Sequence, residues 1–107
     1  MTYKVLIVRE AEDDLLDIFH FLQVHESAER AHEVLTGLEQ AITGLSEQPD
    51  RGHVPPELER VGVATFREIH FKPWRIVYQV AGERVFIHAV LDGRRSVKQQ
   101  LERRLLR

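Results

Sequence analysis

Apolar and polar positions divide the chain into short β-rich runs and longer stretches with a helical period. The run YKVLIV at 3–8 is apolar and rich in strand-forming residues, which predicts a first strand. Four large apolar residues from Leu15 to Leu22 then recur at i, i+3, i+4 and i+7, which predicts a helix over roughly 10–24. Acidic side chains occupy its first turns, where they favour the positive end of the helix dipole.

A second helix is predicted from Ser27, a residue type favoured at the N-cap, to about residue 47. Its apolar stripe comprises Ala31, Leu35, Leu38, Ile42 and Leu45. Because the link between the two helices is short, we expect them to form an antiparallel hairpin. Residues 49–65 are rich in proline and glycine and are predicted to be a loop.

Period-two patterning returns in the second half of the chain. Three strands are predicted there, at about 66–72, 74–81 and 84–91. A last helix is predicted at 96–106, where apolar residues recur four apart. These elements predict one α+β domain over residues 1–107, in the order β-α-α-β-β-β-α. We expect an antiparallel-rich four-stranded sheet with the helical hairpin packed on one face, followed by a C-terminal helix.

Alternation within these strands assigns their side chains to two faces of the sheet. The face toward the helices is predicted to hold Ile69, Phe71, Ile76, Tyr78, Val80, Val85, Ile87, Ala89 and Leu91. The opposite face then carries Glu68, His70, Arg75, Val77, Gln79, Phe86 and His88. No other predicted element obviously covers this second face, which is polar and ionisable. Arg67 falls on the helix-facing side, where we expect an ion pair with an acidic helix residue.

Two further expectations concern packing. The centre of the core is predicted to comprise Leu15, Phe19, Leu38, Tyr78 and Ile87. The first helix carries Phe19 and Phe21 on nearly opposite sides, so that one serves the core and the other offers a groove edge for an extended or helical partner segment.

Composition narrows the class of protein. A chain of 107 residues with 43% hydrophobic content is large enough for one modest core. It has no cysteine, and its histidines show no HxxxH or HxH spacing, so we expect no metal and no cofactor. The apolar run near the N-terminus is too short for a signal peptide or a membrane span. We therefore expect a cytoplasmic protein without membrane partners.

Charge is unevenly placed, although the net charge is only −2. Residues 1–53 hold 4 basic and 11 acidic side chains, whereas residues 54–107 hold 11 basic and 6 acidic ones. This asymmetry suggests a basic surface made by the second half and suited to an anionic partner. The alternative is that an acidic helix pair and a basic sheet attract each other within the fold.

The order of elements and several residue patterns resemble the RelE/ParE superfamily, the toxin halves of bacterial type II toxin–antitoxin modules. The matching residues in the first half are Ala11, Asp14, Leu15, Ile18, Leu45, Pro49 and Gly52. In the second half they are Arg67, the run WRIVYQV from Trp74 to Val80, and HAVLDGRR from His88 to Arg95. The resemblance covers essentially the whole chain. It implies a cognate antitoxin as partner. The superfamily also includes proteins described as plasmid stabilisation factors.

The superfamily implies two different activities. RelE-like members cut mRNA in the ribosomal A site, and ParE-like members poison DNA gyrase. By resemblance, Arg75 matches the strand arginine of the RelE type, and Arg94 or Arg95 matches its later arginine. The two second-strand lysines of that type are not matched, because the nearest positions hold Glu68 and His70. Its C-terminal tyrosine is also missing, since no tyrosine occurs in the last quarter of the chain.

These missing residues favour a non-enzymatic inhibitor of DNA gyrase. The residues predicted to contact the target are Arg75, Arg94, Arg95, Arg103 and Arg104. The alternative is a RelE-like, ribosome-dependent mRNA endonuclease that needs no metal, only a base, an acid and cations for the phosphorane charge. Its candidate catalytic residues are Glu68, His70, Arg75 and His88. The two histidines are otherwise ordinary cross-strand partners, and a third hypothesis is an inactive relative that only binds its antitoxin.

Overall fold

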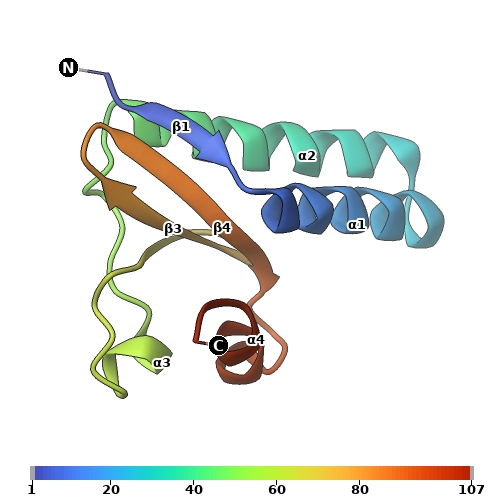
Figure 1. The fold of residues 1–107 in the computed structure, drawn as a ribbon. Coiled ribbons are helices and arrows are strands. Elements are labelled where there is room, and N and C mark those ends of the chain that lie inside the picture. Colours follow the sequence, from blue (N-terminus) through green and yellow to red (C-terminus); the bar gives the residue numbers. More distant parts are fainter. Residues whose placement is uncertain (1, 107) are drawn as a thin grey trace.

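The computed structural model describes residues 2–106 and contains one four-stranded sheet with helices on both faces (Figure 1). The strands are β1 (Lys4–Ile7), β2 (Arg67–Phe71), β3 (Trp74–Ala81) and β4 (Arg84–Asp92). The helices are α1 (Arg9–His25), α2 (Ala28–Thr43), α3 (Pro56–Glu59) and α4 (Val97–Leu105), with a 3-10 turn, η1, at Gly44–Ser46. The predicted α+β fold and its order of elements are confirmed, apart from α3 and η1. None of the helices within residues 2–106 has the length and apolar content needed to cross a bilayer.

The order of strands in the sheet is β1-β4-β3-β2. β2 pairs antiparallel with β3, and β3 pairs antiparallel with β4, whereas β1 pairs parallel with β4 at one edge. A parallel pair needs a long crossover connection, and the chain between β1 and β4 supplies it. The sheet is therefore antiparallel-rich, as predicted, and mixed at one edge.

α1 and α2 form the predicted hairpin and pack together on one face of the sheet (Figure 1). Ser27 is the N-cap of α2, and its hydroxyl oxygen accepts the Arg30 N–H at 3.0 Å. The buried apolar cluster on this side includes Leu15, Leu38, Tyr78 and Ile87. Phe19 packs against that cluster while remaining partly exposed. The predicted centre of the core is thus confirmed, with Phe19 at its margin.

The opposite face of the sheet is partly covered, which corrects the expectation that no element lies over it. α3 and α4 pack on it over a second apolar cluster, which comprises Leu58, Val77, Ala89, Leu91, Val97 and Leu101. The segment 49–65 is therefore not a loop throughout, because α3 brings Leu58 into this cluster at 1% exposure. The apolar side of α4 needs a surface to bury, and the second face of β3 and β4 provides it.

A β-bulge changes the face assignment in β4. The pairing of β3 with β4 passes over His88, with a register shift at that point. A bulge adds one residue to one strand, and the alternation beyond it is reversed. Ala89 and Leu91 were expected on the hairpin side, but they lie in the second cluster, and Val90 takes the hairpin side instead.

Two helix side chains hydrogen-bond to the backbone at this bulge. Asp14 of α1 accepts the Val90 N–H at 2.9 Å, and Arg104 of α4 donates to the His88 carbonyl oxygen at 2.8 Å. Arg104 and Asp14 also form a two-point ion pair, with both N–O distances at 3.0 Å. The bulge therefore ties α1, β4 and α4 together. It is one contact of the kind expected if the acidic half and the basic half attract each other within the fold.

Candidate functional site

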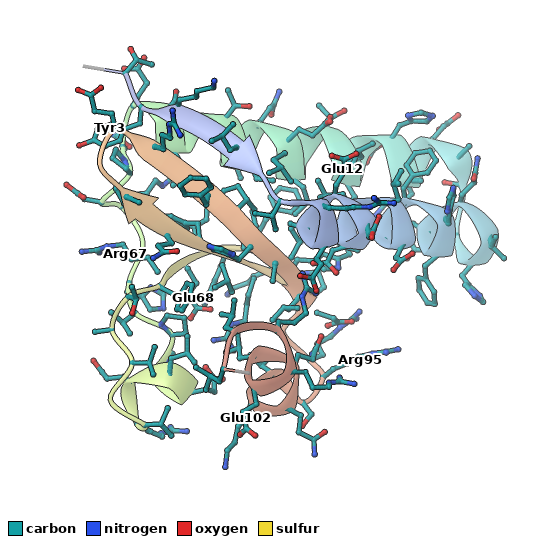
Figure 2. The ribbon with its side chains drawn as sticks, viewed as in Figure 1. Tyr3, Glu12, Arg67, Glu68, Arg95 and Glu102 are labelled. Atoms are coloured by element: carbon teal, nitrogen blue, oxygen red, sulfur yellow. The ribbon has the colours of Figure 1, made fainter. Side chains whose placement is uncertain are left out.

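Charged and imidazole side chains gather on β2 and β3, on the face opposite the hairpin. Glu68, at their centre, is labelled in Figure 2. We call Glu57, Glu68, Arg75, His53 and His70 the Glu68 cluster. Glu68 is only 1% exposed, and its carboxylate accepts two hydrogen bonds from Arg75, at 2.5 Å to Oε1 and 2.9 Å to Oε2. Arg75 also makes a two-point contact with Glu57 of α3, at 2.7 and 2.9 Å.

Backbone pairing brings the members of the Glu68 cluster together. Glu68 and His70 alternate along β2 and so share a face, and the register places Arg75 of β3 opposite His70. His53 joins them through an isolated bridge outside the named strands. In this bridge the His53 N–H donates to the Glu68 carbonyl at 3.1 Å, and the Glu68 N–H donates to the His53 carbonyl at 2.7 Å.

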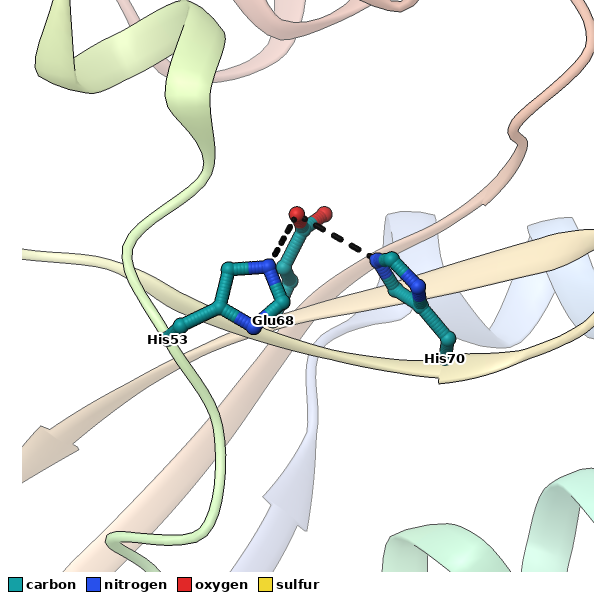
Figure 3. Close-up of side chains that lie close together, drawn as sticks. All are labelled: His53, Glu68 and His70. Atoms are coloured by element: carbon teal, nitrogen blue, oxygen red, sulfur yellow. Dashed lines mark ion pairs between the residues drawn. The ribbon is translucent and has the colours of Figure 1, made fainter.

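Both imidazoles flank the carboxylate of Glu68 (Figure 3). Nε2 of His53 lies 3.0 Å from Glu68 Oε2, and Nε2 of His70 lies 3.4 Å from the same oxygen. The two rings meet edge to face, with 5.4 Å between their centroids. Glu68 is thus surrounded by hydrogen-bonding and ionisable groups from a loop, β2 and β3.

The loop that carries His53 is held in place by Tyr78. The Tyr78 hydroxyl donates to the Pro49 carbonyl at 2.8 Å and accepts the Gly52 N–H at 3.0 Å. Arg67, labelled in Figure 2, donates to the Gly52 carbonyl at 2.8 Å. A Cβ at Gly52 would overlap the Tyr78 hydroxyl and the β2 backbone, so this close approach requires glycine. Arg67 therefore supports the loop, in place of the ion pair expected with an acidic helix residue.

The charged groups of the Glu68 cluster pair with one another. Hydrogen bonds from Arg75 hold the pKa of Glu57 at about 2, and the two carboxylates raise the pKa of Arg75. A guanidinium has five N–H groups, and the contacts to Glu57 and Glu68 engage four of them. With neutral imidazoles, two carboxylates and one guanidinium leave the cluster with a net negative charge.

His88, the fourth candidate for RNA cleavage, has different contacts. Its Nε2 lies 3.1 Å from Gln79 Oε1, and its ring meets Phe66 edge to face at 5.4 Å between centroids. Burial lowers the pKa of His88, and the charge of Arg104 lowers it further. The structure thus brings Glu68, His70 and Arg75 together, while the catalytic roles of all four residues stay predictions.

The five arginines predicted to contact a target have different surroundings. Arg75 and Arg104 are engaged in ion pairs within the chain. Arg94 pairs with the acidic residue two positions before it, and 70% of its side chain is exposed. Arg95, labelled in Figure 2, is exposed beside it, and Arg103 is exposed on α4.

Sequence reasoning missed two members of the Glu68 cluster, His53 and Glu57. The pattern E-x-H at 68–70, in a predicted strand, already places two members of the cluster on one face. His53 lies fifteen residues earlier in a segment without periodicity, so only the folded chain reveals its place.

Comparison with known families gives the relatives of this fold. Residues 5–97 match the family described as "ParE toxin of type II toxin-antitoxin system, parDE". This chain belongs to the ParE toxin family. Membership confirms the RelE/ParE superfamily resemblance and makes the protein a ParE-type toxin of a toxin–antitoxin module. The match ends at the first residue of α4, so most of that helix lies beyond it.

Individual relatives agree with this membership. Toxin ParE3 of Caulobacter vibrioides is 32% identical over 98 residues, which cover 92% of this chain and 94% of the relative. A solved chromosomal ParDE TA system from P. aeruginosa has a TM-score of 0.69 at 19% identity, covering 83% of this chain and 94% of that one. The toxin–antitoxin complex RelBE2 from Mycobacterium tuberculosis has a TM-score of 0.61 at 19% identity, covering 84% and 96%. These two structures establish a shared fold.

Proposed function

We propose that this ParE-type toxin stops growth by acting on DNA gyrase, without a catalytic step of its own. The observation that carries the proposal is the charge of the Glu68 cluster. By resemblance, RelE-like ribonucleases carry their chemistry on second-strand lysines and a strand arginine in this region. Here Glu68 and His70 stand near the lysine positions, and Arg75 is held by Glu57 and Glu68. A phosphate brought to this place would meet net negative charge, which disfavours mRNA binding.

The proposal assigns contact with the target to the exposed cations Arg94, Arg95 and Arg103. Arg75 and Arg104 would contribute by holding α3 and α4 on the sheet, since both are engaged in ion pairs within the chain. Action on gyrase also implies a cytoplasmic location, because the enzyme and its DNA substrate are there.

A cognate antitoxin is proposed to neutralise the toxin by covering the outer side of α1. The two solved relatives are described as a ParDE TA system and a RelBE2 toxin–antitoxin complex. On α1, Phe21 is 55% exposed, Leu16 50% and Val24 78%, on the side away from the buried Leu15 and Leu22. Exposed apolar side chains on a helix suit contact with an amphipathic or extended partner segment. Val24→Asp should therefore weaken antitoxin binding in a pull-down, and unchanged binding would exclude this surface.

The choice between gyrase and the ribosome can be made with purified protein. We expect loss of supercoiling in a gyrase reaction and intact mRNA in a translating ribosome reaction. Arg94→Glu with Arg95→Glu should weaken gyrase inhibition, because like charge at a contact disfavours binding. Lys4→Glu with Arg84→Glu gives the same change in net charge at the other end of β4 and should leave inhibition unchanged.

Histidine variants test the ribonuclease alternative. His70→Ala and His88→Ala should leave growth inhibition nearly intact, whereas a catalytic histidine would contribute roughly 10²–10⁴-fold in rate. Circular dichroism shows whether each variant is folded. Loss of toxicity in a folded variant, together with mRNA cleavage on ribosomes, would replace the gyrase proposal with the ribonuclease, and its active site would be Glu68, His70, Arg75 and His88. A folded protein without either activity would be an inactive relative.

A further inference from the structure

We propose that His53, Glu68 and His70 form a binding site for a divalent transition-metal ion, and we expect the ion to be Zn²⁺. Each of the three residues offers one ligand atom, and these atoms lie within 4.8 Å of one another. Two imidazoles and one carboxylate are a donor set that zinc uses in proteins. The site is independent of the target that the toxin acts on.

The distances between the ligand atoms fit a metal ion placed among them. Glu68 Oε2 lies 3.0 Å from His53 Nε2 and 3.4 Å from His70 Nε2. Ligand atoms around a tetrahedral zinc ion stand about 3.3 Å apart, because each bond to the metal is about 2.0–2.1 Å long. The two imidazoles flank the carboxylate and turn their Nε2 atoms toward it (Figure 3). Binding therefore requires small side-chain movements and no new backbone conformation.

The backbone holds the three ligands in register. Glu68 and His70 are two positions apart on β2, and His53 is bound to Glu68 by two backbone hydrogen bonds, at 2.7 and 3.1 Å. The loop before His53 is in turn held by Tyr78 through Pro49 and Gly52. Ligands on paired backbone need little ordering when the ion binds, which favours affinity.

Charge and neighbouring contacts also favour a cation here. The Glu68 cluster has a net negative charge when the imidazoles are neutral, and a dication would reverse it. Arg75 Nε donates to Glu68 Oε1 at 2.5 Å, which orients the carboxylate and leaves Oε2 facing the histidines. Ligating carboxylates are usually held by such a second hydrogen bond. The contact from Arg75 Nη2 to Oε2, at 2.9 Å, is the one that the ion would displace.

The site is accessible from solvent and selective in its donor types. The side chains of His53 and His70 are 59% and 43% exposed, whereas Glu68 is buried beneath them. An ion can thus enter from the histidine side and keep water in its fourth position. Imidazole donors favour zinc and its neighbours in the periodic table, whereas Mg²⁺ and Ca²⁺ prefer oxygen ligands. Bound metal would join the 49–53 loop to β2 and stabilise the folded state.

Titration of the untagged, full-length protein with Zn²⁺ after treatment with a chelator tests this proposal. We expect saturable binding of one ion per chain by calorimetry, a rise in Tm with Zn²⁺ but none with Mg²⁺, and visible absorption bands of tetrahedral Co²⁺ when cobalt replaces zinc. His53→Ala and His70→Ala should each weaken Zn²⁺ binding by at least about 10–100-fold, since even loss of an outer-sphere partner costs that much. His25→Ala with His32→Ala, which removes two exposed histidines of the hairpin, should bind like the wild type.

A Glu68→Gln variant would also remove a ligand, but it changes a buried residue and can fail to fold. The variants of the exposed residues His53 and His70 keep the test decisive in that case. The proposal is overturned if the wild type shows no saturable Zn²⁺ binding, or if His53→Ala and His70→Ala bind as tightly as the wild type. Loss of binding in the His25→Ala with His32→Ala variant instead would place the metal on the hairpin and would equally overturn it. The histidines would then serve only as ion-pair partners of Glu68. The gyrase reaction is run separately on chelator-treated protein, in which the cluster keeps its net negative charge, so the two proposals fail separately.

Discussion

The hairpin face and the opposite face of the sheet both bury apolar side chains, but only the opposite face buries a carboxylate. On the hairpin side, α1, α2 and three strands share one apolar cluster. On the opposite side, a smaller cluster under α3 and α4 adjoins Glu68, the one buried charged residue within positions 2–106. Burial of apolar surface contributes about 25 cal/mol per Å² and needs no particular partner. A buried charge is stable only while its partners stay in place.

This difference indicates which face of the sheet has a role beyond stabilising the fold. Replacing a buried ion pair with apolar residues of similar size is often neutral or stabilising in proteins. The Glu68 cluster is therefore hard to explain by stability alone, whereas the hairpin face needs no other explanation. The Glu68 cluster therefore suits a binding role on the opposite face of the sheet.

Removing Arg75 should lower the free energy of unfolding more than any other change predicted here for the opposite face. Arg75→Met leaves Glu68 buried without its cation and should lower the free energy of unfolding by about 3–5 kcal/mol. Arg75→Met with Glu68→Met should lose less than the single variant, because the buried carboxylate is removed and Glu57, which also loses its partner, is partly exposed. Urea denaturation measures both. Arg30→Met, which breaks the exposed pairs of Arg30 with Glu26 and Glu33, is the control and should cost less than about 1 kcal/mol. A cost for Arg75→Met no larger than that control would contradict this view of the cluster.

Equal truncations on the two faces should cost different amounts. Leu38 and Leu101 are both fully buried, the first under the hairpin and the second under α4. Each Leu→Ala change should cost about 2–5 kcal/mol, with Leu38→Ala in the upper half of this range and Leu101→Ala in the lower half. The reason is that α4, at the end of the chain, can shift to fill a cavity, whereas α2 packs against both α1 and the sheet. Chemical denaturation of the two variants gives the answer, and a larger cost for Leu101→Ala would reverse the argument.

Acid should weaken the opposite face through Glu57. Its pKa of about 2 in the folded protein lies below the ordinary value of 4.5, so its contribution is complete above pH 4.5 and is lost as the pH falls toward 2. Allowing for partial exposure, that contribution is about 2 kcal/mol. Glu57→Gln should therefore be less stable than the wild type at pH 7 and nearly equal to it at pH 2. Glu33→Gln, on exposed α2, should track the wild type at both pH values, and a gap for Glu57→Gln that stays constant with pH would refute the prediction.

The elements themselves were predictable because their signals are local. The strand expected at 74–81 is Trp74–Ala81, and the helix expected from Ser27 begins with that residue as its N-cap. Apolar spacing and capping depend on residues a few positions apart, so one sequence contains them. The RelE/ParE superfamily was also recognisable, since its matching residues occur in the same order along this chain.

The site was predictable only in part. Glu68, His70 and Arg75 were candidates because alternation puts them on one face, and they do lie together. Arg75 is held by Glu57, which lies on a helix within the proline-rich segment that was predicted to be a loop. His53 carried no spacing signal at all.

By itself, then, the sequence determined the fold class, the hairpin, the strands and the toxin family, because these depend on side-chain spacing and order along the chain. Tertiary structure alone decided that α3 and α4 cover part of the second face, that the bulge at His88 reverses the alternation of β4 beyond it, and that Glu57 and His53 complete the Glu68 cluster. The physical reason is that each of these depends on where segments far apart in the chain meet. The free energy of burying a helix face or pairing a carboxylate depends on these long-range contacts, which a local sequence pattern does not contain.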